Sequence, residues 1–379
     1  MTIKISSEHT LHTFIRIPLL AALSLSSFLV NADTTFSQLN LVTDSQSVNS
    51  AQINDPSLKN AWGLSYTPSG AFWISDNATG VSTLYSVNPT TQVTKKLGLT
   101  VAIPGDGSVT GQVYNNNPNA FKGDSFVFVS EDGTISGWGG GTTAETLQTA
   151  SNANAYKGAA IANIANYSYL YAANFSADRI DVIPGSTATP NLSGNFIDPN
   201  LPTGYAPFNI ENLGGNLFVS YAIQDANKHD DVAGLGNGIV DEFDTQGNLI
   251  ARVASQSGAL NSPWGMAIAP SSFGKYAGDL LVANFGDGKI NAYNLLTNAF
   301  VGQLLDSKGN PLSIDGIWAI SVGNDGGSGS SQTLYFTAGP NGETNGLLGA
   351  VSAVPLPATV WLFGSALLGA GCLRKRPVL

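Results

Sequence analysis

The middle of the chain repeats itself about every 50 residues, and this period constrains the fold more than any other feature. Each copy has an apolar strand, a second strand ending near Asn or Asp, and a Gly-containing turn before a third strand. The copies begin near residues 61, 110, 157, 207, 263 and 317. Repeats of about 40–50 residues with three or four strands are typical of β-propellers. The sequence therefore predicts an all-β fold, a six-bladed β-propeller over residues 33–352.

A small residue recurs near the start of five copies. The positions are Gly63, Gly111, Gly158, Gly265 and Ala319, and the fourth copy has Asn209 instead. Small side chains are expected where strands begin against a crowded central channel. A β-sandwich would not explain the period, and a β-solenoid would have shorter coils. Residues 35–56 precede the first copy, and we expect them to add an outer strand that closes the sixth blade.

Composition agrees with this fold and narrows the partners. The chain has 43 glycines and only 11% charged residues, which suits short strands joined by tight turns. Its formal net charge is −10, and an acidic body argues against nucleic acid as a partner. The single cysteine, Cys372, lies in a C-terminal apolar run, so the body has no disulfide and no thiolate metal site.

The N-terminus predicts export. Lys4 and Arg16 precede an apolar stretch, Ile17–Val30, and Ala32 ends a sequence that suits cleavage. This pattern is typical of a Sec-type signal peptide, residues 1–32, delivered to the Sec translocon. The alternative is a buried N-terminal helix.

The C-terminal segment, residues 353–379, predicts a membrane anchor. An uncharged run, residues 358–373, separates a proline-containing motif from a basic cluster. The motif is Val354, Pro355, Leu356 and Pro357, and the cluster is Arg374, Lys375 and Arg376. The basic cluster would stay cytoplasmic, so the run would be a single transmembrane helix with the body outside.

This tail also resembles the PEP-CTERM sorting signal through the stretch VPLPATVWLFGSALLGAGCLRKR. It departs from that signal at Leu356, where Glu is usual. The resemblance implies recognition by an exosortase, processing near the prolines, and a Gram-negative source that often makes exopolysaccharide. The alternative is a plain membrane anchor.

The body resembles an uncharacterised family of bacterial propellers that often carry this tail. The shared phrases include EDGTISGW, LYAANF, NSPWGMAIAP and NFGDGKINAY, and the match runs from about Leu39 to Val351. The family is distantly similar to NHL-type and lactonase-type six-bladed propellers. The lactonase likeness implies a calcium ion in the central channel.

Polar residues end the second strand of most copies, where we expect them to face the channel. They are Asp76, Asn77, Glu131, Asp132, Asn174, Asn284 and Thr337. Carboxylate and amide oxygens from different blades suit Ca²⁺, and Glu131, Asn174 and Asn284 are the candidate ligands. The alternative is that these side chains satisfy backbone groups of turns.

A charged insertion, residues 224–231, interrupts the fourth copy. Asp225, Asp230 and Asp231 are candidate cation ligands, and His229 is a candidate general base. The spacing does not match an EF-hand, and a solvated loop is the alternative. His229 is the only histidine after the predicted signal peptide, which excludes a His-rich metal site.

Tryptophans recur at the starts of three copies. Trp62, Trp264 and Trp318 are candidate sugar-stacking platforms, but their equivalent positions favour core packing. No G-x-S-x-G elbow, P-loop or zinc motif occurs in the chain.

The favoured hypothesis is a non-enzymatic binding or scaffold protein of the cell envelope or extracellular matrix. Its partners would be exopolysaccharide or other matrix components. The alternative is a calcium-dependent hydrolase of the lactonase or esterase type that uses the central channel.

Overall fold

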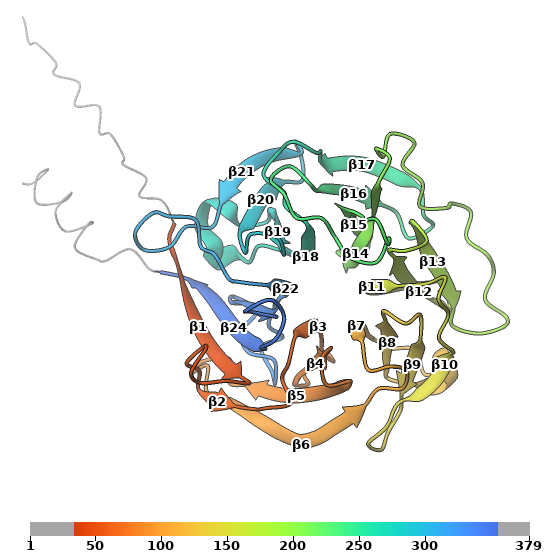
Figure 1. The fold of residues 1–379 in the computed structure, drawn as a ribbon, viewed down its shortest axis with the longest axis horizontal. Helices are drawn as coiled ribbons and strands as arrows, with labels where there is room; N and C mark the ends of the chain where they lie inside the picture. The colour runs from red at the N-terminus through yellow and green to blue at the C-terminus, as the bar shows by residue number, and fades with distance from the viewer. Residues whose placement is uncertain (1–33, 355–379) are drawn as a thin grey trace, which may run out of the picture. The chain divides into compact units, whose positions relative to one another are not determined.

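Six β-sheets, antiparallel apart from the short β2, stand around a central axis in the computed structural model, which describes residues 34–354 (Figure 1). The first blade contains β3 (Ala61–Ser65), β4 (Phe72–Asp76), β5 (Val81–Val87) and β6 (Thr94–Ala102). The second contains β7 (Val109–Tyr114), β8 (Phe126–Ser130), β9 (Ile135–Trp138) and β10 (Glu145–Gln148). The third contains β11 (Tyr156–Ile164), β12 (Tyr167–Asn174) and β13 (Arg179–Pro184).

The remaining blades follow the same pattern. The fourth contains β14 (Tyr205–Leu213), β15 (Asn216–Ile223), β16 (Ile239–Phe243) and β17 (Leu249–Ala254). The fifth contains β18 (Pro263–Ile268), β19 (Leu280–Asn284), β20 (Ile290–Asn294) and β21 (Ala299–Gln303). The sixth contains β22 (Ile317–Val322), β23 (Leu334–Ala338), β24 (Leu347–Ala353), β1 (Phe36–Thr43) and β2 (Ile53–Asn54).

The first strand of each repeat is the strand closest to the axis. These inner strands are β3, β7, β11, β14, β18 and β22, and each contacts the next around the ring (Figure 1). The last of them, β22, contacts β3, so segments some 250 residues apart in the chain lie side by side. The predicted six-bladed propeller is confirmed.

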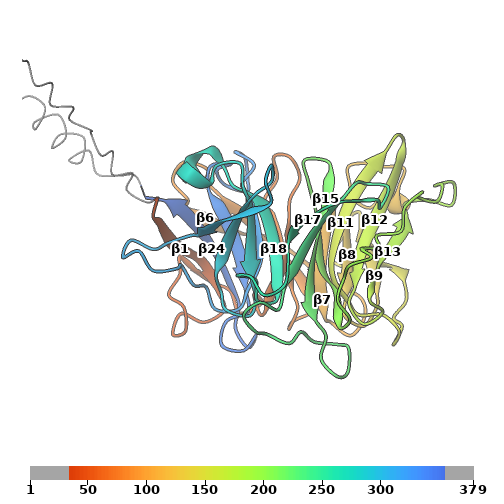
Figure 2. The same cartoon turned by 90° about the horizontal axis from the view of Figure 1, so that it is seen from above.

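The N-terminal strand closes the ring. β1 pairs antiparallel with β24, from Phe36 opposite Ala353 to Thr43 opposite Leu347. Figure 2 shows the two strands together from the side. The sixth blade therefore combines both ends of the described chain, and the expectation for residues 35–56 is confirmed. Pairing β24 in this way leaves it no open edge for another chain to join.

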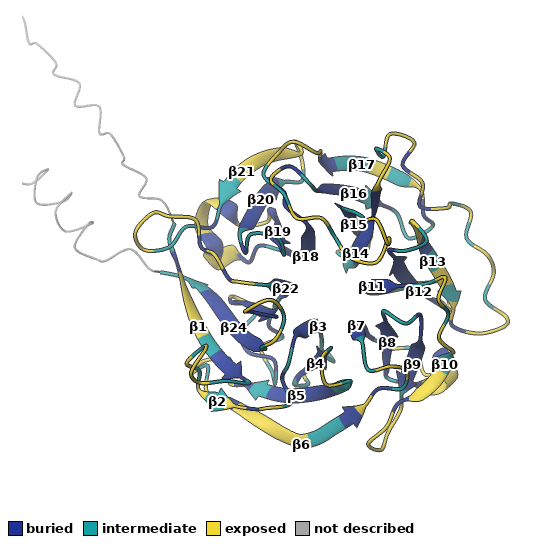
Figure 3. Cartoon of the chain, in the orientation of Figure 1, coloured by how far each residue is buried: buried dark blue, intermediate teal, exposed yellow. Residues whose placement is uncertain are grey.

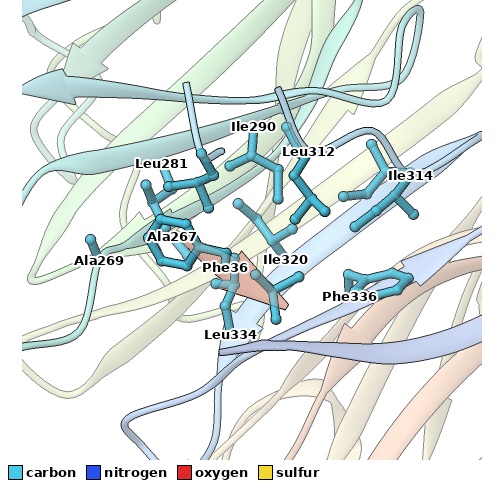
Figure 4. Close-up of a cluster of buried hydrophobic side chains, with 14 of the residues drawn as sticks. Phe36, Ala267, Ala269, Leu281, Ile290, Leu312, Ile314, Ile320, Leu334 and Phe336 are labelled. Carbon is cyan, nitrogen blue, oxygen red and sulfur yellow. The ribbon is translucent and has the colours of Figure 1, made fainter. Parts of the chain in front are cut away.

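Apolar side chains fill the spaces between neighbouring blades. Figure 3 shows the inner strands coloured mainly as buried and outer strands such as β6 coloured largely as exposed. One such cluster lies between the fifth and sixth blades, where Leu281 and Ile290 meet Ile320 and Phe336 (Figure 4). Phe36 enters the same cluster from β1, with its ring centroid 4.8 Å from that of Phe273. Since each sheet buries its faces on its neighbours, the repeat becomes stable only as a closed set.

The recurring small residues lie where inner strands approach each other most closely. A Cβ atom on Gly111 would lie 2.6 Å from the backbone nitrogen of Ala159 in the next blade. A Cβ atom on Gly63 would overlap the carbonyl oxygen of Thr110 in the same way. These contacts are shorter than van der Waals separation, so the glycines set the spacing of the ring.

Several predictions from the ends of the sequence lie outside the described residues. They are the signal peptide, the C-terminal helix, and all of the sorting motif except Val354. Within residues 34–354, no helix is long and apolar enough to cross a membrane.

Candidate functional site

Aromatic rings plug the central channel. Four of them, Trp62, Phe208, Trp264 and Trp318, occupy the position just before the recurring small residue. The second and third blades have Thr110 and Lys157 at that position. Trp62 stacks on Trp318 with ring centroids 3.7 Å apart, and Phe285 stacks on Trp318 at 3.9 Å. We call Trp62, Phe175, Phe208, Trp264, Phe285 and Trp318 the aromatic plug. The tryptophans are buried in the plug, in agreement with core packing.

A cavity of about 280 Å³ adjoins the plug, and we call it the pore cavity. Its apolar wall is formed by Trp62, Phe208, Phe285 and Trp318. Its polar wall comes from four different blades and contains Glu131, Lys157, Asp230, Asp231 and Glu343. The polar residues lie at the strand ends and loops on the side where the inner strands begin, so the ring brings together positions far apart in the sequence.

Lys157 is the cation of this cavity. It takes the register position that is aromatic in four other blades, and its side chain is only 2% exposed. Its ammonium forms ion pairs with Glu131 and with Asp230, whose Oδ1 is 3.2 Å away. The ammonium also lies 5.6 Å from the centroid of the Trp62 ring. Burial alone would lower the pKa of Lys157, but the two carboxylates outweigh burial and raise it, so the ammonium stays charged.

Carboxylates outnumber ammonium groups around the cavity by four to one. Burial raises the pKa of Asp231 and of Glu343. For Glu343, the nearby charges of Glu131 and Asp231 raise the pKa further. The cavity is therefore an acidic site whose negative charge Lys157 only partly compensates.

Hydrogen bonds fix the carboxylates in place. Asn60 Nδ2 donates to Glu343 Oε2 at 2.8 Å and to Asn77 Oδ1 at 3.2 Å. Asn77 Nδ2 in turn donates to Glu131 Oε2 at 3.1 Å. The indole N–H of Trp318 donates to Asn60 Oδ1 at 2.9 Å, which ties this network to the plug.

Some of the residues predicted from the sequence converge at this site. Glu131, Asp230 and Asp231 line the pore cavity, and Asn77 binds Glu131. His229 is half-exposed next to it, with Nδ1 2.9 Å from Asp230 Oδ1. One ligand atom each from Glu131, His229 and Asp230 lie within 4.8 Å of one another. The insertion thus folds toward the channel.

The two asparagines proposed as calcium ligands are bonded within their own blades. Asn174 Nδ2 donates to Asp181 Oδ2 at 2.7 Å, and Asn284 Nδ2 donates to Asp287 Oδ1 at 3.0 Å. Neither side chain lines the pore cavity. Of the three candidate ligands only Glu131 reaches it, and calcium itself stays a prediction.

The other predicted polar residues have hydrogen-bond partners outside the pore cavity or next to it. Asp76 is buried and accepts from Thr83 Oγ1 at 2.7 Å. Thr337 donates to the carbonyl oxygen of Trp62. Two more accept backbone N–H groups: Asp132 from Thr134 at 2.8 Å, and Asp225 from His229 at 2.9 Å. The bonds of Asp132 and Asp225 agree with the turn-stabilising alternative, whereas those of Asp76 and Thr337 join neighbouring strands and neighbouring blades.

Sequence reasoning did not select Lys157 or Glu343. A signal for Lys157 existed, because a lysine replaces the aromatic residue at one register position of the repeat. Glu343 lies in the loop between β23 and β24, where nothing in its spacing indicates that it faces the channel.

The fold and the site define the described part of the chain as a six-bladed β-propeller with an acidic cavity at one end of its channel. No protein-family model matches the chain. It is 29% identical over 330 residues to an uncharacterised protein of Acanthamoeba polyphaga mimivirus, covering 81% of this chain and 78% of that protein. A second uncharacterised mimivirus protein is 34% identical over 209 residues, covering 54% of this chain and 53% of the relative.

Among solved structures, similar folds include a streptogramin B lyase, with a TM-score of 0.47 and 12% identity over 85% of this chain and 98% of that one. Another is the PQQ-bound aldose sugar dehydrogenase of Streptomyces coelicolor, with a TM-score of 0.47 and 15% identity over 85% of this chain and 99% of that one. These likenesses concern the fold alone.

Proposed function

We propose that this chain is an exported binding protein of the cell envelope or extracellular matrix and that the pore cavity is its ligand site. Export rests on the predicted signal peptide, and display at the envelope rests on the PEP-CTERM-like tail and its recognition by an exosortase. Exopolysaccharide or another matrix component is the proposed partner class.

The convergence of charged groups on one cavity carries the proposal. Lys157, Glu131 and Glu343 come from three blades and meet beside an aromatic wall. Removing such charges from water costs several kcal/mol per ion, and their mutual attraction often fails to repay it. A propeller that needed only stability would fill this space with apolar side chains, as it does in the plug. Ligand binding gives a reason for the charges.

The geometry favours binding over covalent catalysis. The walls of the pore cavity contain carboxylates, one lysine and aromatic rings. The lysine is held as an ammonium by two ion pairs, which makes it a poor nucleophile. The groups present are suited to hold a polar ligand in place.

The test compares binding of the full-length protein and its variants to an array of envelope and matrix polysaccharides. Lys157→Met removes the charge at similar length, and Asp230→Asn neutralises a side chain that is 68% exposed and so endangers folding less. Lys308→Met, in an exposed turn, is the matched control. We expect both cavity variants to lose at least tenfold in affinity and the control to bind normally. Unchanged binding by both cavity variants would refute the cavity as the ligand site.

A metal-dependent hydrolase is the second candidate, and the grouping of Glu131, His229 and Asp230 favours it. One histidine with two carboxylates is a common set of metal ligands. A metal ion, including the predicted Ca²⁺, would compete with Lys157 for the same two carboxylates. Lactone or ester turnover that is lost with a chelator and in His229→Ala would establish the hydrolase. Metal analysis of the purified protein gives an independent readout.

A further inference from the structure

We propose that the pore cavity selects ligands that carry a protonated amine next to an oxygen acceptor, as in a 2-amino sugar. This inference rests on the proposed function, because it names the ligand class of the same site. It is argued from the charges on the polar wall and from one unpaired indole group.

The charge balance of the polar wall calls for a cation. Lys157 pairs with Glu131 and Asp230, while Asp231 and Glu343 have no ion-pair partner among residues 34–354. The cavity is partly enclosed by protein, where uncompensated charges repel each other more strongly than in water. An ammonium group placed between Asp231 and Glu343 would neutralise this repulsion and receive charge-assisted hydrogen bonds.

The second observation is an unpaired donor on the apolar wall. The indole N–H groups of Trp264 and Trp318 donate to the Lys157 carbonyl oxygen and to Asn60 Oδ1, at 3.0 and 2.9 Å. Trp62 is equally buried and lines the cavity, yet its Nε1 has no hydrogen-bond partner in the described part of the chain. A buried donor without an acceptor costs free energy, and an oxygen atom on a ligand would remove that cost.

Lys157 has one further donor beyond its two ion pairs. An ammonium has three N–H groups, and the ion pairs with Glu131 and Asp230 use two of them. The ammonium also lies near the face of Trp62. The lining of the cavity therefore combines carboxylate acceptors with two donors, the Trp62 indole N–H and the third N–H of Lys157, which complements a group with both an amine and a hydroxyl or carboxylate.

The cavity volume limits the ligand to a small unit. About 280 Å³ is at the lower end of small-molecule sites and suits one monosaccharide or one amino acid. Both sources share the amine-plus-oxygen chemistry. A 2-amino sugar unit of a polysaccharide is the source that agrees with the proposed matrix partner.

Calorimetric titration of the full-length protein at pH 6.5 tests the inference. The probes are glucosamine, glucose, N-acetylglucosamine and glycine. Glucosamine carries the ammonium, whereas glucose lacks it and N-acetylglucosamine has it acylated. We expect glucosamine to bind at least tenfold more tightly than either neutral sugar. Glycine binding as tight as that of glucosamine would support the amine-plus-oxygen chemistry and assign the source as an amino acid.

Two variants test the proposed contacts of the amine with Glu343 and of the oxygen acceptor with the Trp62 indole N–H. Glu343→Gln removes one charge and keeps the shape, and Trp62→Phe keeps a ring and removes the indole N–H. We expect glucosamine affinity to fall at least tenfold in the first and at least threefold in the second. Glu145→Gln, an exposed glutamate on β10, is the control and should bind like wild type. Thermal melting of each variant shows whether it is folded.

The inference is overturned if the neutral sugars bind as well as glucosamine, if no amine binds, or if folded Glu343→Gln and Trp62→Phe bind normally. Its failure differs from failure of the proposed function. A neutral polysaccharide whose binding depends on Lys157 would refute the amine preference and leave the pore cavity as the ligand site.

Discussion

The surroundings of the Glu211 side chain shift its pKa strongly. Glu211 lies on the inner strand β14, and burial raises its pKa to about 8. The amide of Asn209 is 3.4 Å from its Oε1 and offsets only part of this effect. Burial raises the pKa of Tyr66, and the charge of Glu211 raises it further. Glu211 does not line the pore cavity.

We expect Glu211→Gln to stabilise the protein at neutral pH and not in acid. An ordinary glutamate titrates near pH 4.3, so between that pH and about 8 the folded protein binds a proton that the unfolded chain does not. Wild-type stability therefore falls as pH rises through this window. A pKa difference of this size corresponds to about 5 kcal/mol, and because Glu211 is only partly buried we expect the variant to gain about half of that at pH 8 and nothing at pH 4. Urea unfolding at both pH values checks this, and an equal difference at both would contradict it.

Which residues form the site could be predicted only in part from the sequence. Glu131, Asp230 and Asp231 could be predicted because charged residues are rare in this chain and these three follow the ends of repeat strands. Asn174 and Asn284 occupy similar repeat positions but bond to the turns that follow them, at Ala177 and Asp287. The repeat pattern specifies where a residue lies along a strand. It does not specify whether a local partner holds the side chain before it can reach the channel.

At the scale of the element, the spacing of neighbouring inner strands is set by backbone contacts at the recurring glycines. The period and the small residues were sufficient to predict six blades, because both follow from packing between repeats. The repeat pattern did not predict how many strands each blade contains. The third blade has three strands, and residues 185–204 connect it to the next blade without a fourth. That connection has no apolar alternation that would have indicated its path.

We expect Gly111→Ala to destabilise the ring by about 2–3 kcal/mol, because the new methyl group meets the backbone of β11 and cannot be accommodated by a side-chain rotation. Gly98→Ala on β6 is the matched control, since its Cβ would meet nothing within 4 Å. That control should change stability by less than about 0.5 kcal/mol. Urea unfolding of both variants is the measurement. Equal stabilities would show that the close approach is not required.

At the scale of the whole molecule, stability depends on closure by β1. Phe36 is buried between the fifth and sixth blades, whereas Leu39 on the same strand is 39% exposed. Truncating Phe36 therefore weakens the contact that joins the two ends of the ring. Truncating Leu39 leaves that contact in place.

We expect Phe36→Ala to cost about 3–4 kcal/mol and Leu39→Ala less than about 0.5 kcal/mol. Because the blades support one another around the ring, the loss should appear as a shift of the whole unfolding transition. Circular dichroism and tryptophan fluorescence, followed together during urea unfolding, measure this. A small loss for Phe36→Ala would mean that closure contributes little to stability.

The pairing of β1 with β24 brings the two ends of the described chain together. The backbone N–H of Val354 donates to the carbonyl oxygen of Thr35 at 2.8 Å, so the described chain enters and leaves at one corner of the sixth blade. Any tether attached at either end would hold the ring by its perimeter rather than by its axis. Such a tether would leave both mouths of the channel uncovered.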